Sequence, residues 1–266
     1  MNYVICDMDG TLLNSNKELP VKLPAMIQEL KKRHICFGAA SGRQYFNLYE
    51  QFQDAKDMLF IAENGGIIYE GEKPLYADRI ASVDLIPVIQ RLRTCTNAYP
   101  VVCGVKGAYI EAKDPIFMEH AAMYYTKLTL VDDLLAILEQ DQIVKIAVYD
   151  KVNSETNCYP YMKNHFGTLR GVVSGVDWMD ISNPDASKGK AITFMKAEKL
   201  LTSDDFVAFG DFMNDAEMLK ECTYSYAMEN AHEEIKQIAN YHTCSNDEDG
   251  VIKALCSLFD IAYDTL

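Results

Sequence analysis

Short apolar runs alternate with helical segments at both ends of this 266-residue chain, and this alternation limits the possible folds more than any other feature. Apolar runs at residues 4–6, 35–40 and 59–62 are typical of buried strands. Between the first two, the stretch from Pro20 to Arg33 carries apolar residues at helical spacing. Strands that alternate with helices predict a parallel sheet with helices on its faces. Because the crossovers are right-handed, the carboxyl ends of the strands share one edge, where ligands bind.

The middle of the chain has a different character. Residues 82–183 combine predicted helices with hairpin-like strand pairs: helices at 84–93, 132–140 and 154–166, and strands at 100–105, 108–111, 143–149, 169–174 and 178–182. The alternating pattern returns after Asn183-Pro184, with a helix from Ser187 to about Leu200, strands at 206–209 and 224–228, and a short edge strand near residues 241–243. We therefore predict a Rossmann-like α/β core made of residues 1–81 and 184–266, with an α+β domain of residues 82–183 inserted in it.

Composition narrows the choice of partners. A net charge of −14 argues against nucleic acid or an anionic membrane, but it is compatible with a small phosphorylated metabolite bound at a local site. No apolar run approaches the roughly 18–20 residues of a membrane span, and the N-terminal residues are too few for a signal peptide. Eight cysteines lack Cys-x-x-Cys spacing, which indicates buried thiols in a reducing cytosol and hence a cytoplasmic protein.

The run Asp7-Met8-Asp9-Gly10-Thr11 directly follows the first apolar strand. Two carboxylates this close raise each other's pKa unless a cation or hydrogen-bond donors lie between them. A hard divalent cation such as Mg²⁺, which takes oxygen ligands, accounts for the pair. The alternative is a polar turn at the end of a strand.

Three further polar clusters fall at predicted strand ends or helix starts. Each also has an ordinary structural explanation: Ser41-Gly42 as a helix N-cap, Lys188 as a solvated lysine, and the acids of the run Asp211–Asp215 as turn residues. Together with Asp7 and Asp9 they supply metal ligands, a nucleophile, an acid/base, a hydroxyl and an ammonium. Phosphoryl transfer needs these groups, because its catalysis is mostly positioning and charge neutralisation.

In combination and order, these motifs resemble the haloacid dehalogenase superfamily, specifically a Cof-type phosphatase with a class IIB α+β cap. The resemblance covers nearly the whole chain and has no departure at the catalytic positions. It rests on Asp7-Met8-Asp9-Gly10-Thr11, Ala40-Ser41-Gly42-Arg43, Asn64-Gly65, Asn183-Pro184 with Ser187-Lys188-Gly189, Gly210–Asp215, Ala227–Ala231 and Ser245–Val251.

The resemblance implies a role for each acid of the core. Asp7 is the expected nucleophile, which forms an aspartyl-phosphate, and Asp9 is the expected acid/base. Mg²⁺ is expected on Asp7, on the main-chain carbonyl of Asp9 and on Asp211, with support from Asp215.

It also implies a phosphate site and a mobile cap. Ser41 and Lys188 are expected to act in catalysis and to bind phosphate, and the remaining expected phosphate contacts are Met8, Gly42, Arg43 and Asn214. The cap is expected to close over the site and exclude water. Candidates for contacts with a sugar or alcohol are Arg43, Tyr45, Lys145, Asp177 and Trp178, for which surface or packing roles are equally open.

The expected reaction is Mg²⁺-dependent hydrolysis of a small phosphomonoester, such as a sugar phosphate. A phosphomutase of the phosphomannomutase type is the first alternative, because such enzymes share this core and cap. A non-enzymatic module that signals through a phosphorylated Asp is the second. The inserted domain and the Asp7-x-Asp9 pair argue against it, because a signalling module needs no acid/base two residues after its phosphoacceptor.

Overall fold

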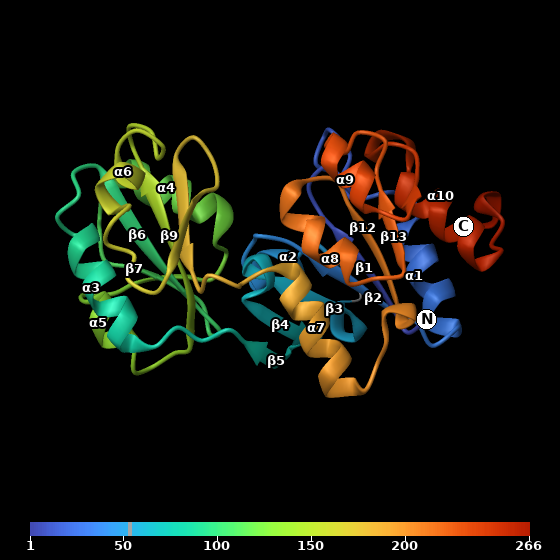
Figure 1. Ribbon diagram of the computed structural model, residues 1–266, viewed down its shortest axis with the longest axis horizontal. Coiled ribbons are helices and arrows are strands. Elements are labelled where there is room, and N and C mark those ends of the chain that lie inside the picture. The colour runs from blue at the N-terminus through green and yellow to red at the C-terminus, as the bar shows by residue number, and fades with distance from the viewer. Residues whose placement is uncertain (53–54) are drawn as a thin grey trace. The chain divides into compact units, whose positions relative to one another are not determined.

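The computed structural model describes residues 1–52 and 55–266, which form two compact units. Unit 1 contains residues 1–42, 55–73 and 187–266, and unit 2 contains residues 43–52 and 74–186 (Figure 1).

Unit 1 contains the strands from β14 to β4 of an eight-stranded sheet with the order β14-β13-β12-β1-β2-β3-β4-β5, and the last strand, β5, starts at the end of unit 1 and continues into unit 2. All pairs from β14 to β3 are parallel, and β4 turns back antiparallel to β3. This confirms the predicted parallel sheet and its short edge strand. The strands are β1 (Tyr3–Asp7), β2 (Cys36–Ala40), β3 (Leu59–Ala62), β4 (Ile67–Glu70), β5 (Lys73–Ala77), β12 (Phe206–Gly210), β13 (Tyr224–Ala227) and β14 (Tyr241–His242).

Helices join these strands. The first of them buries Leu23, Met26, Ile27 and Leu30, the apolar positions that predicted a helix there. Its last turn carries Lys31 and Lys32, where a cation interacts favourably with the helix dipole. The helices of unit 1 are α1 (Leu23–Lys32), α7 (Lys188–Lys199), α8 (Ala216–Lys220), α9 (Glu233–Ile238) and α10 (Gly250–Phe259).

The register of the sheet brings the three polar strand ends together. Asp7, the last residue of β1, is paired with Ala40 of β2, and the preceding Cys6 is paired with Phe209 of β12. The residues that follow β2 and β12, Ser41 and Asp211, therefore leave the sheet at the level of Asp7. The expectation that strand ends converge on one edge is confirmed.

Unit 2 contains a six-stranded sheet with the order β10-β11-β9-β6-β7-β8, antiparallel except between β7 and β8. Its strands are β6 (Ala98–Gly104), β7 (Ala108–Ile110), β8 (Leu128–Leu130), β9 (Ile143–Asp150), β10 (Arg170–Val173) and β11 (Trp178–Ser182). Its helices are α2 (Tyr45–Tyr49), α3 (Ser82–Leu92), α4 (Pro115–Tyr124), α5 (Leu134–Ile137) and α6 (Cys158–Met162).

The central strand β9 is buried along its whole length, and its side chains alternate between two cores. Ile146 and Val148 join a core that includes residues of α3, α5 and α6. Ala147 and Tyr149 join a second core with Phe117 of α4. Both faces of this sheet are therefore covered.

The observed unit 2 is larger than the predicted insert of residues 82–183. The main-chain N–H of Ile80 donates to the carbonyl of Ile143, and the side chain of Asn183 donates to the carbonyl of Asp78, at 2.8 Å and 3.2 Å. These bonds tie the connecting segments to unit 2, so its bounds move outward to residues 74 and 186.

Some predicted helices of unit 2 are shorter in the structure, and two elements were not predicted. The segment 154–166 is α-helical only in α6, and at its start the main-chain N–H and the hydroxyl of Ser154 bond to the carbonyls of Val176 and Gly175. The segment 132–140 is reduced to α5, whose N-cap is Asp133. Helix α4 escaped prediction because it is apolar on its exposed side as well, at Ile116 and Met123. Strand β8 is only three residues long.

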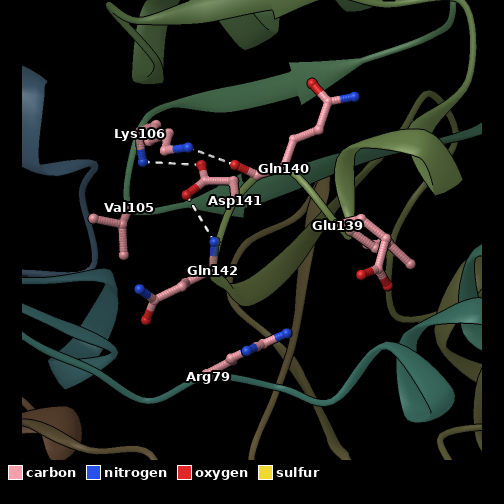
Figure 2. A pocket seen from close by; sticks show the side chains of 8 residues that line it. Arg79, Val105, Lys106, Glu139, Gln140, Asp141 and Gln142 are labelled. Atoms are coloured by element: carbon pink, nitrogen blue, oxygen red, sulfur yellow. Dashed lines mark hydrogen bonds between the residues drawn. The ribbon is translucent and has the colours of Figure 1, made fainter.

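A hollow of about 220 Å³ in unit 2 is lined by Arg79, from the segment before α3, and by residues of the turns after β6 and before β9, namely Val105, Lys106, Leu138, Glu139, Gln140, Asp141 and Gln142 (Figure 2). Its buried acid, Asp141, accepts hydrogen bonds from the main-chain N–H groups of Lys106 and Gln142, at 2.9 Å and 2.7 Å (Figure 2). The hydroxyl of Tyr109 adds a third bond at 3.0 Å. The carboxylate thus holds the two turns together.

Within the described ranges, no helix has both the length and the hydropathy that crossing a bilayer requires. All eight cysteines lie in these ranges, and none of them forms a disulfide.

Candidate active site

Asp7 ends strand β1 and is nearly buried, with 6% of its surface exposed. Its Oδ1 accepts a hydrogen bond of 2.5 Å from the ammonium of Lys188. Burial, together with the nearby charge of Asp215, nevertheless raises the pKa of Asp7 to about 8. One ammonium therefore does not fully compensate this carboxylate.

Lys188 is the first residue of α7 and is completely buried. Its ammonium also donates to Oδ1 of Asp215 at 2.7 Å. Burial opposes its charge, but Asp215 and Asp7 together raise the pKa of Lys188 above its ordinary value. A cation at a helix N-terminus is unfavourable by itself, and the two carboxylates explain why this lysine tolerates the position. It is not a solvated lysine.

Asp215 acts as a brace for the loop after β12. Its Oδ2 accepts the main-chain N–H groups of Asp211 and Phe212, at 3.0 Å and 3.2 Å, while its Oδ1 holds Lys188. Both oxygens of Asp215 are therefore engaged, which fits the supporting role expected for it.

Asp211 lies beside the loop that follows β1. Its Oδ1 accepts the hydroxyl of Thr11 at 2.9 Å, and burial raises its pKa. A Cβ on Gly10 would lie 2.4 Å from its Oδ2, and Gly10 has a positive φ of +82°. Only glycine has no Cβ to clash with Asp211 and also adopts this φ without strain. Gly10 thus permits the close approach of Asp211 to the end of β1.

Three carboxylates gather at this edge of the sheet. Asp7, Asp211 and Asp215 each offer an oxygen, and these oxygens lie within 4.8 Å of one another. Lys188 is the only ammonium bonded to them among the described residues, so ionisation of all three carboxylates would leave two negative charges in excess. A divalent cation would neutralise them, and carboxylate oxygens are the ligands that Mg²⁺ prefers. The residues present therefore fit a metal site.

Asp9 differs from these acids. Its side chain is 41% exposed, and its Oδ1 forms an ion pair with Lys17 at 3.0 Å. It is not part of the carboxylate cluster, although Asp7 is only two residues away. The two acids of the Asp-x-Asp run therefore have separate environments.

Ser41, Gly42 and Asn214 meet around Asn64, which follows β3. The N–H of Asn64 donates to the carbonyl of Ser41 at 3.0 Å, and Asn214 donates to Oδ1 of Asn64 at 3.3 Å. A Cβ on Gly42 would lie 2.9 Å from the Asn64 amide nitrogen. Asn64 adopts a left-handed conformation with φ 54°, which its short polar side chain tolerates.

Asn64 and Thr11 were not among the predicted site residues, although both lie in the quoted motifs. Neither residue carries a charge, so only the fold reveals their contacts.

Among the other predicted residues, Met8, Arg43, Tyr45 and Lys145 are buried or half-buried. Met8 is fully buried and can offer a substrate only main-chain atoms, and Arg43 is half-buried in unit 2. Tyr45 is also buried in unit 2, where it packs edge-on against Phe46. Lys145 is buried beside Asp180, at 3.6 Å.

Trp178 belongs to an aromatic cluster of unit 2. Its ring lies against those of Tyr124 and Tyr149, with centroid separations of 5.4 Å in both cases. The structure therefore supports a packing role for it.

An α/β sheet with an acid cluster and a buried lysine at its strand ends, interrupted by an α+β unit, defines a class of phosphoryl-transferring hydrolases. Residues 4–255 match the family of haloacid dehalogenase-like hydrolases, and the chain belongs to this family.

The relatives and structural neighbours of the chain include named phosphatases. The chain is 28% identical to the 5-amino-6-(5-phospho-D-ribitylamino)uracil phosphatase YbjI of Escherichia coli, over 96% of this chain and 95% of the relative. It is 26% identical to YitU of Bacillus subtilis, a phosphatase named for the same substrate, over 97% of this chain and 98% of the relative. In fold it is similar to the subclass IIB sugar phosphatase BT4131, with a TM-score of 0.77 at 18% identity, over 98% and 100% of the two chains. The expected Cof-type, class IIB resemblance is confirmed, and the chain is a phosphomonoester hydrolase of this family.

Proposed function

We propose that this protein hydrolyses small phosphomonoesters, in a Mg²⁺-dependent reaction, through an aspartyl-phosphate, an acyl phosphate formed on Asp7. One observation carries the proposal. A buried carboxylate at a strand end is fixed by Lys188, and it lies among acids whose excess charge fits a divalent cation.

Asp7 is the proposed nucleophile. One of its oxygens attacks phosphorus, and the bond from phosphorus to the ester oxygen breaks. Covalent catalysis of this kind divides one difficult displacement into two easier ones. The bond from Lys188 supports the role, because it holds the carboxylate in one orientation. When bound, Mg²⁺ stabilises the ionised carboxylate and reduces repulsion between it and the anionic phosphate.

Asp9 is the proposed acid/base. In the first step its proton goes to the departing alkoxide, and in the second it takes a proton from the water that attacks phosphorus. The water releases inorganic phosphate and restores the Asp7 carboxylate. The position of Asp9 outside the acid cluster supports this role, because a metal-bound carboxylate could not carry the proton.

The proposed metal ligands are Asp7, Asp211 and the main-chain carbonyl of Asp9, with Asp215 in support. Asp215 already binds Lys188 and two main-chain N–H groups, so it organises the site. The proposed phosphate contacts are Ser41, Gly42, Lys188 and Asn214, together with main-chain atoms of Met8 and the side chain of Arg43. Asn64 supports this set, since it contacts three of its members.

We further propose that unit 2 is the cap and that the substrate is a phosphorylated sugar or sugar-like polyol. The substrate in the names of YbjI and YitU carries its phosphate on a ribityl chain, and BT4131 is named a sugar phosphatase. On the ribityl chain the phosphate is attached to an alkyl oxygen of a polyhydroxylated chain. Such an oxygen is a poor leaving group as an alkoxide, so its departure requires the proton that the proposed acid Asp9 supplies.

The test incubates the purified protein and Mg²⁺ with a panel of hexose phosphates and 5-amino-6-(5-phospho-D-ribitylamino)uracil, and measures free phosphate. Phosphate release that stops on chelation with EDTA is the expected result. An isomeric sugar phosphate without free phosphate would identify a mutase instead. No turnover of any ester would contradict the proposal.

A further inference from the structure

Two motifs of the resemblance, Ala227–Ala231 and Ser245–Val251, supply no residue to the site described above. In the structure they belong to unit 1, where they follow β13 and precede α10. Both of them hydrogen-bond to the loop Gly10–Ser15, which follows the acids Asp7 and Asp9.

Asn230 and Asn246 contact the loop and each other. The side chain of Asn230 donates to the carbonyl of Gly10 at 2.7 Å, and that of Asn246 donates to the carbonyl of Leu13 at 2.9 Å. The main-chain N–H of Asn246 donates to Oδ1 of Asn230 at 3.1 Å. The two side chains therefore form one connected clamp on the loop.

A second pair of bonds lies at the end of the loop. The main-chain N–H and the hydroxyl of Ser15 donate to the two carboxylate oxygens of Asp247, at 2.7 Å and 2.6 Å. These bonds lower the pKa of Asp247. The clamp and Asp247 together hold the loop at its beginning, middle and end, that is, at Gly10, Leu13 and Ser15.

The loop is buried at Thr11, Leu12 and Leu13, whereas its beginning next to Asp9 is more exposed. Gly10 has a positive φ, and the Asp9 side chain is 41% exposed. The main chain closes on itself through the bonds from Leu12 and Leu13 to the carbonyl of Met8, at 3.1 Å and 2.8 Å. The carbonyl of Gly10 lies one residue beyond Asp9 and one before Thr11, whose hydroxyl contacts Asp211. The bond from Asn230 therefore fixes the peptide between these two groups.

We propose that Asn230 and Asn246 are positioning residues that hold the loop Gly10–Ser15 so that the Asp9 carboxyl is aimed at the leaving oxygen of the substrate. This inference rests on the proposed role of Asp9 as the acid. Loss of the clamp leaves the fold and the carboxylate cluster in place but widens the range of positions of Asp9.

Leaving-group chemistry separates this role from a merely structural one. An alkyl ester needs a proton on its departing oxygen, whereas the 4-nitrophenolate of an aryl ester departs without one. A misplaced Asp9 therefore slows a hexose 6-phosphate more than 4-nitrophenyl phosphate. A general loss of folded enzyme slows both equally.

The experiment measures kcat and KM on both esters for the wild type and for Asn230→Ala, Asn246→Ala and Asp9→Asn. Asn240→Ala is the matched control, because its amide donates to the Thr223 carbonyl, away from the loop. For both clamp variants we expect kcat on the hexose phosphate to fall about tenfold and kcat on the aryl ester to fall much less. KM and the melting temperature should change little. Asp9→Asn should show the same selectivity in stronger form, and Asn240→Ala none.

An equal fall on both esters, or no change in either clamp variant, would overturn the inference. If a clamp variant does not fold, Asp247→Asn, which weakens the bonds to Ser15, gives the same comparison. A wild type inactive on both esters defeats the proposed function, and the inference with it. Selectivity in Asp9→Asn without selectivity in the clamp variants defeats this inference alone.

Discussion

Asp150 in unit 2 is completely buried and accepts hydrogen bonds from the main-chain N–H groups of Val152 and Cys158, both at 2.9 Å. The side-chain amide of Asn157 contacts both of its oxygens, at 3.1 Å and 2.9 Å. In unit 1, Asp7 shares one ammonium with Asp215 and has its pKa raised to about 8. Neutral N–H donors satisfy the carboxylate of Asp150. Asp7, in contrast, belongs to a cluster of three carboxylates with one ammonium.

The contrast distinguishes a structural acid from a functional one. A carboxylate that accepts several N–H bonds is satisfied and stabilises its surroundings. A cluster of carboxylates with too few donors costs free energy in the metal-free protein, and binding a cation recovers it. Burial alone does not separate the two cases, because Asp7 and Asp150 are both buried.

The largest expected difference is in turnover. Asp7→Asn should lower kcat on the order of 10³-fold or more, because the amide cannot serve as the nucleophile. Asp150→Asn should leave kcat per folded molecule unchanged. Steady-state phosphate release, corrected for the folded fraction, measures both, and an active Asp7→Asn enzyme would contradict the assignment.

The next effect concerns Lys188. Lys188→Met should destabilise unit 1 by about 3 kcal/mol, because it leaves buried carboxylates without their ammonium. Adding Asp215→Asn should recover part of this loss, since it removes one of the charges left unpaired. Chemical denaturation of the single and double variants gives the coupling, and strictly additive effects would show that the two side chains do not interact.

Two isosteric substitutions should act in opposite directions on stability. Asp150→Asn places an NH₂ group against N–H donors and should destabilise unit 2 by about 1–3 kcal/mol. Asp7→Asn replaces an acid whose ionised form burial and Asp215 disfavour with a neutral amide, so it should stabilise the metal-free unit 1. Hydrogen exchange of peptides from β9 and from β1 reports on each unit separately. Destabilisation by both substitutions would remove the distinction between the two acids.

A smaller effect is the pH dependence of metal-free stability. The folded-state pKa of Asp7, about 8, lies above its ordinary value of 3.8, so between these pH values folded protein retains a proton that unfolded chain has lost. The free energy of unfolding of unit 1 should therefore decrease as pH rises from about 4 to 8. Lys188 stays charged throughout this range. Denaturation at several pH values should show this slope in wild type and a flatter one in Asp7→Asn.

Much of this architecture was predictable from sequence. Local periodicity is enough to identify α1, β1 and β12, and parallel crossovers then place Asp7, Ser41 and Asp211 on one edge. Helix α4 was not predictable, because its exposed apolar residues remove the helical alternation. The bounds of unit 2 depend on long-range hydrogen bonds such as that of Asn183 to Asp78, which no local pattern encodes.

The residues of the candidate site also divide into those that the sequence predicts and those that only the fold reveals. Charged residues at strand ends are visible in the sequence. The uncharged residues that orient them, Thr11, Asn64 and Asn230, act through main-chain and side-chain contacts between distant segments. Only the fold brings these segments together, so their roles could not be derived from spacing.

The most direct test of the central claim is the melting temperature of the wild type, Asp7→Asn and Asp150→Asn with and without Mg²⁺. A cation that binds only the folded cluster raises stability by mass action. We predict a clear increase with Mg²⁺ for wild type and Asp150→Asn, and a much smaller one for Asp7→Asn. No increase for wild type, or an equal increase for all three proteins, would contradict a metal site at Asp7.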